Sequence, residues 1–263
     1  MRASVGHPPA DARIAVPAAV HPGGPLLTPC AAVDVINPES IAQVYAEAHH
    51  RIVGLVRDLD GDAVRRQVPG TPEWTVHDVV AHLAAIPTDV MAGRLTGGPS
   101  PEETRRQVEE RRDRTVAELL EEWAGGLGPI LDGARAGLVP APLAIDAVTH
   151  EQDIRGALHA AHLDDDGALR FAATGYSVGL GRRLKQAGLP PLRLRDRARG
   201  FDVVARTGEP TATVSGTEFE LFRAMAGRRS RAQVAALDWS VDPAPYLDCF
   251  CVFGPLPEAD ISD

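Results

Sequence analysis

The sequence predicts an α+β protein in which four amphipathic helices precede a smaller region of short strands and helices. Up to His162, apolar residues recur at steps of three and four, which is the spacing of helices with one buried face. After Gly167, short alternating segments appear between proline and glycine pairs that mark turns. The chain has 263 residues, enough for one large or two small domains with a buried core.

The first two helices have clear start signals. Asn37 is a good N-cap residue, and the proline and glutamate that follow it suit the first helical turn, so a helix is predicted from there to about Asp60. The turn-rich segment 68–74 then separates this helix from a second one, which Thr75 can cap. Asp78 stands where a capping box has glutamate.

The third and fourth helices are predicted from similar signals. Ser100 caps a third helix that continues to about Ile130, and its first part, 102–114, carries charges of both signs. We interpret this part as a solvated helix face with salt bridges rather than a binding surface. A fourth helix is predicted from about Pro142 to His162.

The remaining segments set the domain boundaries. Residues 1–36 contain repeated prolines and are predicted to form a disordered or loosely packed arm, residues 37–165 the helical bundle, and residues 166–263 a small α+β domain. The predicted elements of the last domain are a helix at 169–188, strands at 192–195, 201–206 and 211–215, and a helix at 218–226.

Composition narrows the classes of function. The net charge of −9 disfavours nucleic acid as a partner, because an acidic chain repels phosphate. No apolar run approaches the roughly 18 residues that cross a bilayer, so no membrane association is expected. Three cysteines do not make a disulfide framework, so we expect a cytoplasmic protein. We also expect it to be a monomer or a homodimer.

The histidines of the second helix differ in their helical positions. At 100° per residue, His82 falls at the margin of the apolar face, whereas His77 falls on the opposite side and is predicted to point to solvent. Only His82 is therefore a candidate for a buried polar site.

The fourth helix has polar residues on its apolar face. Asp146, His150 and Asp153 share that face, whereas Glu151 and Arg155 are predicted to look outward. Burying a carboxylate without a partner costs several kcal/mol, so this stripe needs a counter-charge, hydrogen bonds or a cation.

Two interpretations of this stripe remain open from spacing alone. Asp146 and His150 lie one turn apart and can reach one metal ion, with a third ligand from the second helix. Alternatively, His150 is a core histidine that is hydrogen-bonded to Asp146 or Asp153, and His82 has no part in a site.

Three segments together resemble one known family. The segment 72–83, PEWTVHDVVAHL, is similar to the PGWTVRDVVAHL signature of the mycothiol-dependent maleylpyruvate isomerase family, a branch of the DinB-like metalloproteins. The segment 146–155, DAVTHEQDIR, looks like the second motif of that family, an acid before an HxxD[LI] core. The segment 215–228, SGTEFELFRAMAGR, resembles its ELLLWLxGR helix. The order of the motifs makes the combination more specific than any one of them.

The resemblance implies a fold and a set of site residues. It implies a DinB-like four-helix bundle, a small α+β C-terminal domain, and a divalent metal, usually zinc, held by His82, Asp146 and His150. The isomerase itself has glutamate at the position of Asp146, and the shorter aspartate could shift the ion or mark another substrate class. Asp153 would orient His150. Arg228 is a candidate for binding an anionic substrate or a carboxylate of the thiol, or else a cation at the C-terminal end of a helix.

The resemblance also implies a reaction. A low-molecular-weight thiol, mycothiol, would be the cosubstrate, and its thiolate would add to a small electrophilic substrate in an isomerase or an S-transferase. Cys249 and Cys251 are then ordinary thiols, because the nucleophile comes from the cosubstrate. The arginine-rich composition agrees with an actinobacterial source, where mycothiol is made.

Two alternative functions remain. A divalent-metal hydrolase or lyase would use metal-bound water as its nucleophile instead of a thiol. A non-catalytic protein would bind a small ligand in the C-terminal domain, with a structural metal or none.

Overall fold

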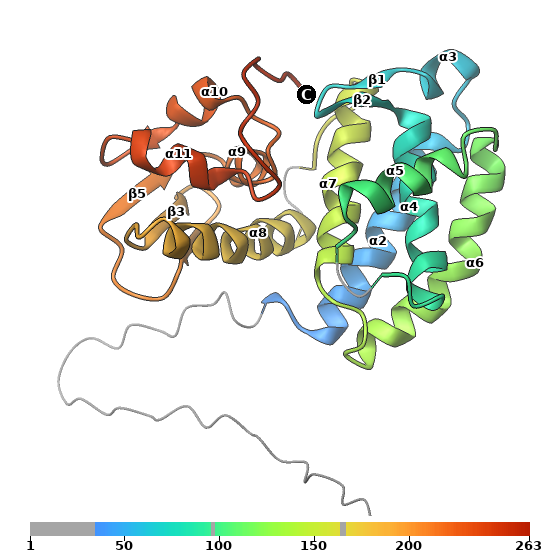
Figure 1. The fold of residues 1–263 in the computed structure, drawn as a ribbon, viewed down its shortest axis with the longest axis horizontal. Helices are drawn as coiled ribbons and strands as arrows, with labels where there is room; N and C mark the ends of the chain where they lie inside the picture. Colours follow the sequence, from blue (N-terminus) through green and yellow to red (C-terminus); the bar gives the residue numbers. More distant parts are fainter. Residues whose placement is uncertain (1–34, 96–97, 164–166) are drawn as a thin grey trace, which may run out of the picture.

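The structure is a computed structural model that describes residues 35–95, 98–163 and 167–263 (Figure 1). The arm predicted for residues 1–36 lies outside these residues except for Val35 and Ile36, which pack against the core. The boundary predicted at residues 165 and 166 also lies outside them, so the domain limits stay a prediction.

Four long helices form the N-terminal bundle. These are α2 (Pro38–Val56), α4 (Val76–Met91), α6 (Val116–Arg135) and α7 (Pro142–Ala157). Helix α2 packs against α6 and α7, and α4 packs against the same two helices, so the four close into a ring around one apolar core. The predicted α+β class with an N-terminal four-helix bundle is confirmed.

The start signals of these helices act as the sequence predicts. The side chain of Asn37 accepts a hydrogen bond from the backbone of Ser40 at the start of α2. Thr75 and Asp78 form a reciprocal capping box at the start of α4. This cap fixes the first residue of α4 and thereby the position of His82 along it.

The single third helix predicted from Ser100 to Ile130 is wrong. The structure has a short α5 (Pro101–Glu109) and a separate α6, because Thr115 and Glu118 form a new capping box. The solvated face predicted for 102–114 is also only partly right, since Gln107 and Arg111 are buried. Both side chains point into the bundle, where they take part in polar networks.

A small hairpin lies between α2 and α4. After the four-residue α3 (Gly61–Val64), strands β1 (Gln67–Val68) and β2 (Thr71–Thr75) pair in antiparallel fashion where the sequence indicates a turn-rich connector. β1 packs against α7, so the hairpin lies beside one end of that helix (Figure 1).

The C-terminal part combines a four-stranded sheet with helices. Its long helix is α8 (Gly167–Gln186), and its sheet has the order β4-β3-β5-β6. β3 pairs with β4 antiparallel and with β5 parallel. The strands are β3 (Leu192–Asp196), β4 (Phe201–Ala205), β5 (Ala212–Ser215) and β6 (Asp238–Trp239), and the shorter helices are α9 (Glu218–Met225), α10 (Arg231–Ala235) and α11 (Ala244–Phe250). The elements β6, α10 and α11 are short, and the sequence pattern does not predict them.

Helix α7 lies where the two parts of the molecule meet (Figure 1). It packs against α2 within the bundle and against α8 of the C-terminal part, so almost all of its residues are buried. The outward position predicted for Glu151 is therefore wrong: its side chain is 0% exposed and pairs with Arg51 and Arg155. Arg155 itself is mostly buried and reaches the carbonyl of Ala161.

Among the described residues, none of the helices has the length and apolar character needed to cross a membrane.

Candidate metal centre

The structure brings His82, Asp146 and His150 together. One ligand atom from each lies within 4.8 Å of the others. His82 comes from α4, whereas Asp146 and His150 lie one turn apart on α7. Because α4 and α7 pack side by side in the bundle, the two histidines meet across the helix interface with their ring centroids 5.2 Å apart.

The protonation of His82 follows from its hydrogen bonds. Nδ1 of His82 lies 2.8 Å from Oε1 of Gln107, and Nε2 of Gln107 lies 2.7 Å from Oδ2 of Asp89. An ionised carboxylate only accepts hydrogen bonds, so the Gln107 amide turns its NH2 group toward Asp89 and its oxygen toward His82. Nδ1 of His82 must then carry the proton that it donates, and in the neutral ring Nε2 has a lone pair.

Asp89 is held ionised by its neighbours. Burial opposes its ionisation, but hydrogen bonds from Gln107, Arg94 and Arg106 outweigh burial and lower the pKa of Asp89. Its side chain is fully buried, and Arg106 donates to it at 2.7 Å. The direction of the hydrogen bonds from Asp89 to His82 is therefore fixed.

His150 is oriented in the same way. Its Nδ1 lies 3.0 Å from Oδ2 of Asp153, which accepts a hydrogen bond from the Nδ1–H group. Burial raises the pKa of Asp153, but Arg228 and Arg223 outweigh burial and hold this pKa well below its ordinary value. The remaining nitrogen of His150, Nε2, therefore also offers a lone pair when the ring is neutral.

The two Nε2 atoms converge on Asp146. Nε2 of His82 lies 3.1 Å from Oδ2, and Nε2 of His150 lies 3.5 Å from Oδ1. Lone pairs on both nitrogens would face the lone pairs of a carboxylate, an arrangement that either a proton on Nε2 or a cation between the three groups stabilises. The donor set of two imidazoles and one carboxylate fits a divalent metal such as zinc, with coordination positions left for other ligands.

Asp146 supplies the charge of this cluster. Burial raises the pKa of its carboxyl, but His150, His82 and Arg228 outweigh burial, so the pKa lies below its ordinary value. Its side chain is 25% exposed, against 2% for His82 and 7% for His150. The cluster is thus approached from the side of Asp146, while the imidazoles are enclosed.

Trp74 covers the two imidazoles. Its ring lies 5.7 Å from that of His150 in a stacked arrangement and 5.3 Å from that of His82 in a tilted one. Trp74 lies at the end of β2, just before the helix that carries His82. The hairpin therefore places an apolar ring against both histidines.

Residues 45–144 match the sequence model of the mycothiol maleylpyruvate isomerase N-terminal domain. This part of the chain is therefore similar to that domain family. The match extends from α2 to the start of α7 and includes His82, Asp89 and Gln107.

Solved structures support the same fold over most of the chain. The chain superposes on a mycothiol-dependent maleylpyruvate isomerase with a TM-score of 0.50 and 16% identity, and on a histidine-to-alanine mutant described by the same name with a TM-score of 0.51 and 14% identity. Each match covers 80% of this chain and 95% of the solved one. A search of curated protein sequences finds no match.

Asp153 joins the centre of this maleylpyruvate isomerase-like fold to the C-terminal part. Besides His150, it accepts hydrogen bonds of 2.8 Å from Nη2 of Arg223 and from Nη2 of Arg228. Arg228 is buried just beyond the end of α9, and its Nη1 donates to the carbonyl of Ala226. In the structure its guanidinium is thus occupied by Asp153 and a helix carbonyl, so a role in binding an anionic substrate stays a prediction.

The solvent-facing position predicted for His77 is only partly right. Its side chain is 17% exposed, and Nε2 donates to the carbonyl of Arg114 at 2.7 Å. The chain between α5 and α6 folds back over this histidine, which the helical position of His77 does not reveal. His77 does not belong to the cluster of possible metal ligands among the described residues.

Sequence reasoning missed Trp74, Gln107 and Asp89. Gln107 and Asp89 lie far apart in the chain, on α5 and α4, and Gln107 belongs to the charged segment that the sequence analysis assigned to solvent. The one available signal was the uncharged Gln107 within that charged segment. Trp74 lies within the family signature, but the sequence alone gives it no role.

Replacing Gln107 with leucine is expected to weaken zinc binding about tenfold, because Nδ1 of His82 loses its acceptor and the imidazole loses its fixed orientation. The measurement is zinc affinity by competition with a chromophoric chelator. Gln43→Leu is the matched control, since Gln43 is exposed on α2 and its side-chain amide donates a hydrogen bond to Glu47 on the same helix, away from the centre. An unchanged affinity in Gln107→Leu would contradict the role of this hydrogen bond.

Proposed function

We propose that this protein is a metal-dependent enzyme that uses mycothiol, a low-molecular-weight thiol, to isomerise or S-conjugate a small electrophilic substrate. The observation that carries the proposal is the convergence of the Nε2 atoms of His82 and His150 on the Asp146 carboxylate. The family of residues 45–144 and the fold shared with a mycothiol-dependent maleylpyruvate isomerase support a thiol as cosubstrate.

His82, Asp146 and His150 would hold the metal. When bound, a divalent metal such as zinc supplies Lewis acidity, which favours the thiolate form of a thiol cosubstrate. Gln107 and Asp153 keep the protons of the two imidazoles on Nδ1 and so keep both Nε2 atoms available. Trp74 excludes water from the imidazole side, which leaves the partly exposed side of Asp146 for thiol and substrate.

The reaction then needs a nucleophile that the chain does not provide at this position. Cys249 lies in α11, and Cys251 follows that helix and packs on Gly227. Both thiols are buried, and burial raises the pKa of the Cys249 thiol. A thiolate from the cosubstrate would add to an electrophilic carbon of the substrate, after which an isomerase expels the thiol and a transferase releases the conjugate.

Arg228 would contribute a positive charge near the reacting groups. Its pKa is raised above the ordinary range because its ion pair with Asp153 outweighs burial, so it stays charged. We propose that it acts mainly by holding Asp153, and that contact with an anionic substrate requires one of its present hydrogen bonds to be exchanged.

The test measures turnover of maleylpyruvate and of chlorodinitrobenzene by the zinc-loaded protein, with and without mycothiol. We expect turnover with mycothiol above the rate of the thiol alone and none without it. The His150→Ala protein, treated with zinc in the same way, is the matched control, and we expect it to show no turnover above the rate of the thiol alone. Turnover that is equal without any thiol would contradict the proposal and favour a hydrolase or lyase that uses water. A protein that binds no divalent metal and keeps its stability in a chelator would favour the non-catalytic alternative.

A further inference from the structure

The segment 257–263 runs back along the C-terminal helices and ends beside α7 and the hairpin (Figure 1). The backbone N–H of Arg231 donates to the carbonyl of Pro257 at 3.0 Å. The side chain of Gln233 accepts from the N–H of Ile261 at 3.1 Å and donates to its carbonyl at 2.8 Å. The segment is therefore bound along its length, and its position is defined by α10.

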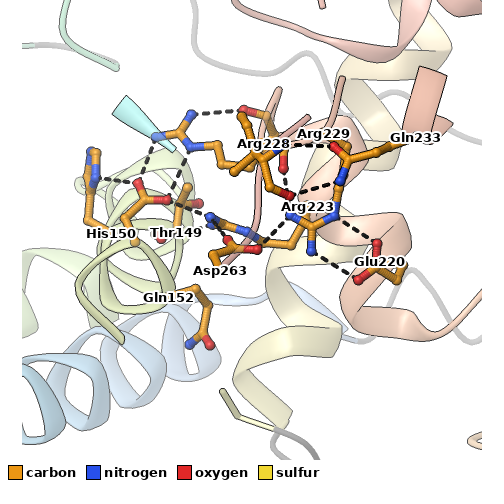
Figure 2. Close-up of polar contacts among 12 residues, drawn as sticks. Thr149, His150, Gln152, Glu220, Arg223, Arg228, Arg229, Gln233 and Asp263 are labelled. Atoms are coloured by element: carbon orange, nitrogen blue, oxygen red, sulfur yellow. Dashed lines mark hydrogen bonds and ion pairs between the residues drawn. The ribbon is translucent and has the colours of Figure 1, made fainter. Parts of the chain in front are cut away.

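The side chain of Asp263 is buried between two arginines. Its main chain is exposed, but its side chain is only 2% exposed. Oδ1 accepts a hydrogen bond of 2.7 Å from Arg229, and Oδ2 accepts one from Arg223 (Figure 2). A Cβ atom on Gly156 of α7 would lie 2.6 Å from Cβ of Asp263, so the glycine leaves the space that this side chain fills.

The arginines that hold Asp263 are themselves buried. The side chain of Arg223 is 0% exposed and that of Arg229 is 6% exposed. Their other carboxylate partners are Asp153, which Arg223 shares with Arg228, and Glu220, which pairs with Arg229. Without the carboxylate of Asp263, the buried positive charge of this cluster would exceed its negative charge.

We propose that Arg223, Arg229 and Gly156 form a carboxylate-binding slot, which this chain fills with its own Asp263. Each carboxylate oxygen faces one guanidinium, which is the arrangement that a free carboxylate such as formate can reproduce. The slot would bind a small monocarboxylate. In the unaltered protein, Asp263 at the end of the segment 257–263 supplies this carboxylate.

The slot is connected to the candidate metal centre. Arg223 donates to both Asp263 and Asp153, and Asp153 accepts from Nδ1 of His150. A filled slot thus keeps Arg223 in the position where it supports Asp153. This connection rests on the proposed function, whereas binding of a carboxylate in the slot does not.

A carboxylate from solution can reach the slot. A pocket of about 360 Å3 adjoins it, and its lining includes Asp263, Glu220, Phe219 and His162. Because Asp263 itself lines this pocket and also contacts Arg229, we expect removal of its side chain to open the slot to the pocket.

The experiment uses Asp263→Ala in the full chain and measures thermal unfolding with and without sodium formate. We expect Tm to fall by roughly 5–10 °C, because a buried pair is broken. Formate at about ten times its Kd should restore about 3–5 °C in a saturable manner, whereas sodium chloride at the same ionic strength should restore less. No saturable response to formate would overturn the proposal.

Two further variants keep this test decisive. Asp260→Ala removes another acid of the same segment but leaves the slot filled, so no formate response is expected; an equal response would place the effect elsewhere. Asp263→Asn fills the slot without the charge, so we expect a lower Tm than that of the parent and no formate response. A Tm equal to that of the parent would overturn the proposal even where Asp263→Ala fails to fold. These measurements need neither metal nor turnover, so their failure is distinct from failure of the proposed function.

Discussion

The His82→Ala and His150→Ala proteins are expected to bind no stoichiometric divalent metal, with affinities at least about 100-fold below that of the parent, because each removes one of the nitrogens that converge on Asp146. The measurement is elemental analysis after dialysis, combined with chelator competition. Both rings are buried, so their loss also leaves a small cavity, and the free energy of unfolding should be recorded for each variant.

His77→Ala is the matched control for these two variants. His77 lies on the same helix as His82 and also makes a hydrogen bond through Nε2, but its partner is the carbonyl of Arg114. It should keep full metal stoichiometry and lose a little stability. Equal metal loss in all three proteins would show that the centre is not formed by these residues.

Replacing Asp153 with alanine is expected to lower the free energy of unfolding by about 3–5 kcal/mol, because it leaves two buried guanidinium groups without a shared carboxylate. The same change removes the acceptor for Nδ1 of His150 and should weaken zinc binding by about 10- to 100-fold. Urea unfolding of the metal-free protein measures the first effect, and chelator competition measures the second.

The matched control for Asp153 is Asp202→Ala. Asp202 is an exposed acid of β4 that also pairs with two arginines, Arg193 and Arg195. Exposed ion pairs contribute at most about 1 kcal/mol, so this change should have a small effect on unfolding and none on zinc affinity. A similar loss of stability in both variants would mean that the buried position of Asp153 has no special role.

Local signals predicted the elements of the fold that they directly control. Asn37 and Thr75 cap the helices that the sequence places after them, and α4 then carries His82, which is predicted at the margin of its apolar face, into the core. The i, i+4 spacing of Asp146 and His150 likewise puts both on one face of α7. These features depend only on residues within about one turn of helix, so they can be predicted from the sequence without knowledge of the tertiary structure.

The sequence pattern did not predict which helices are buried on more than one face. Glu151 lies on the side of α7 that a single amphipathic helix would expose, but α7 is covered by both parts of the molecule, so Arg51 of another helix neutralises it. The capping box at Thr115 marks the break between α5 and α6. The burial of Gln107 could not be predicted, because this residue lies in a segment of charged residues that is typical of a solvent-exposed helix face.

The sequence alone determined the class of fold and the starts of α2 and α4, because helical periodicity and capping are local properties. The candidate ligands followed from the resemblance of the sequence to a known family. Only the tertiary structure decided how the candidate ligands are protonated and supported. Gln107 is brought to His82 by α5, and Arg223 is brought to Asp153 by α9, across long separations in the chain. Such contacts depend on how elements pack, and the same packing encloses the carboxylate of Asp263 between two arginines.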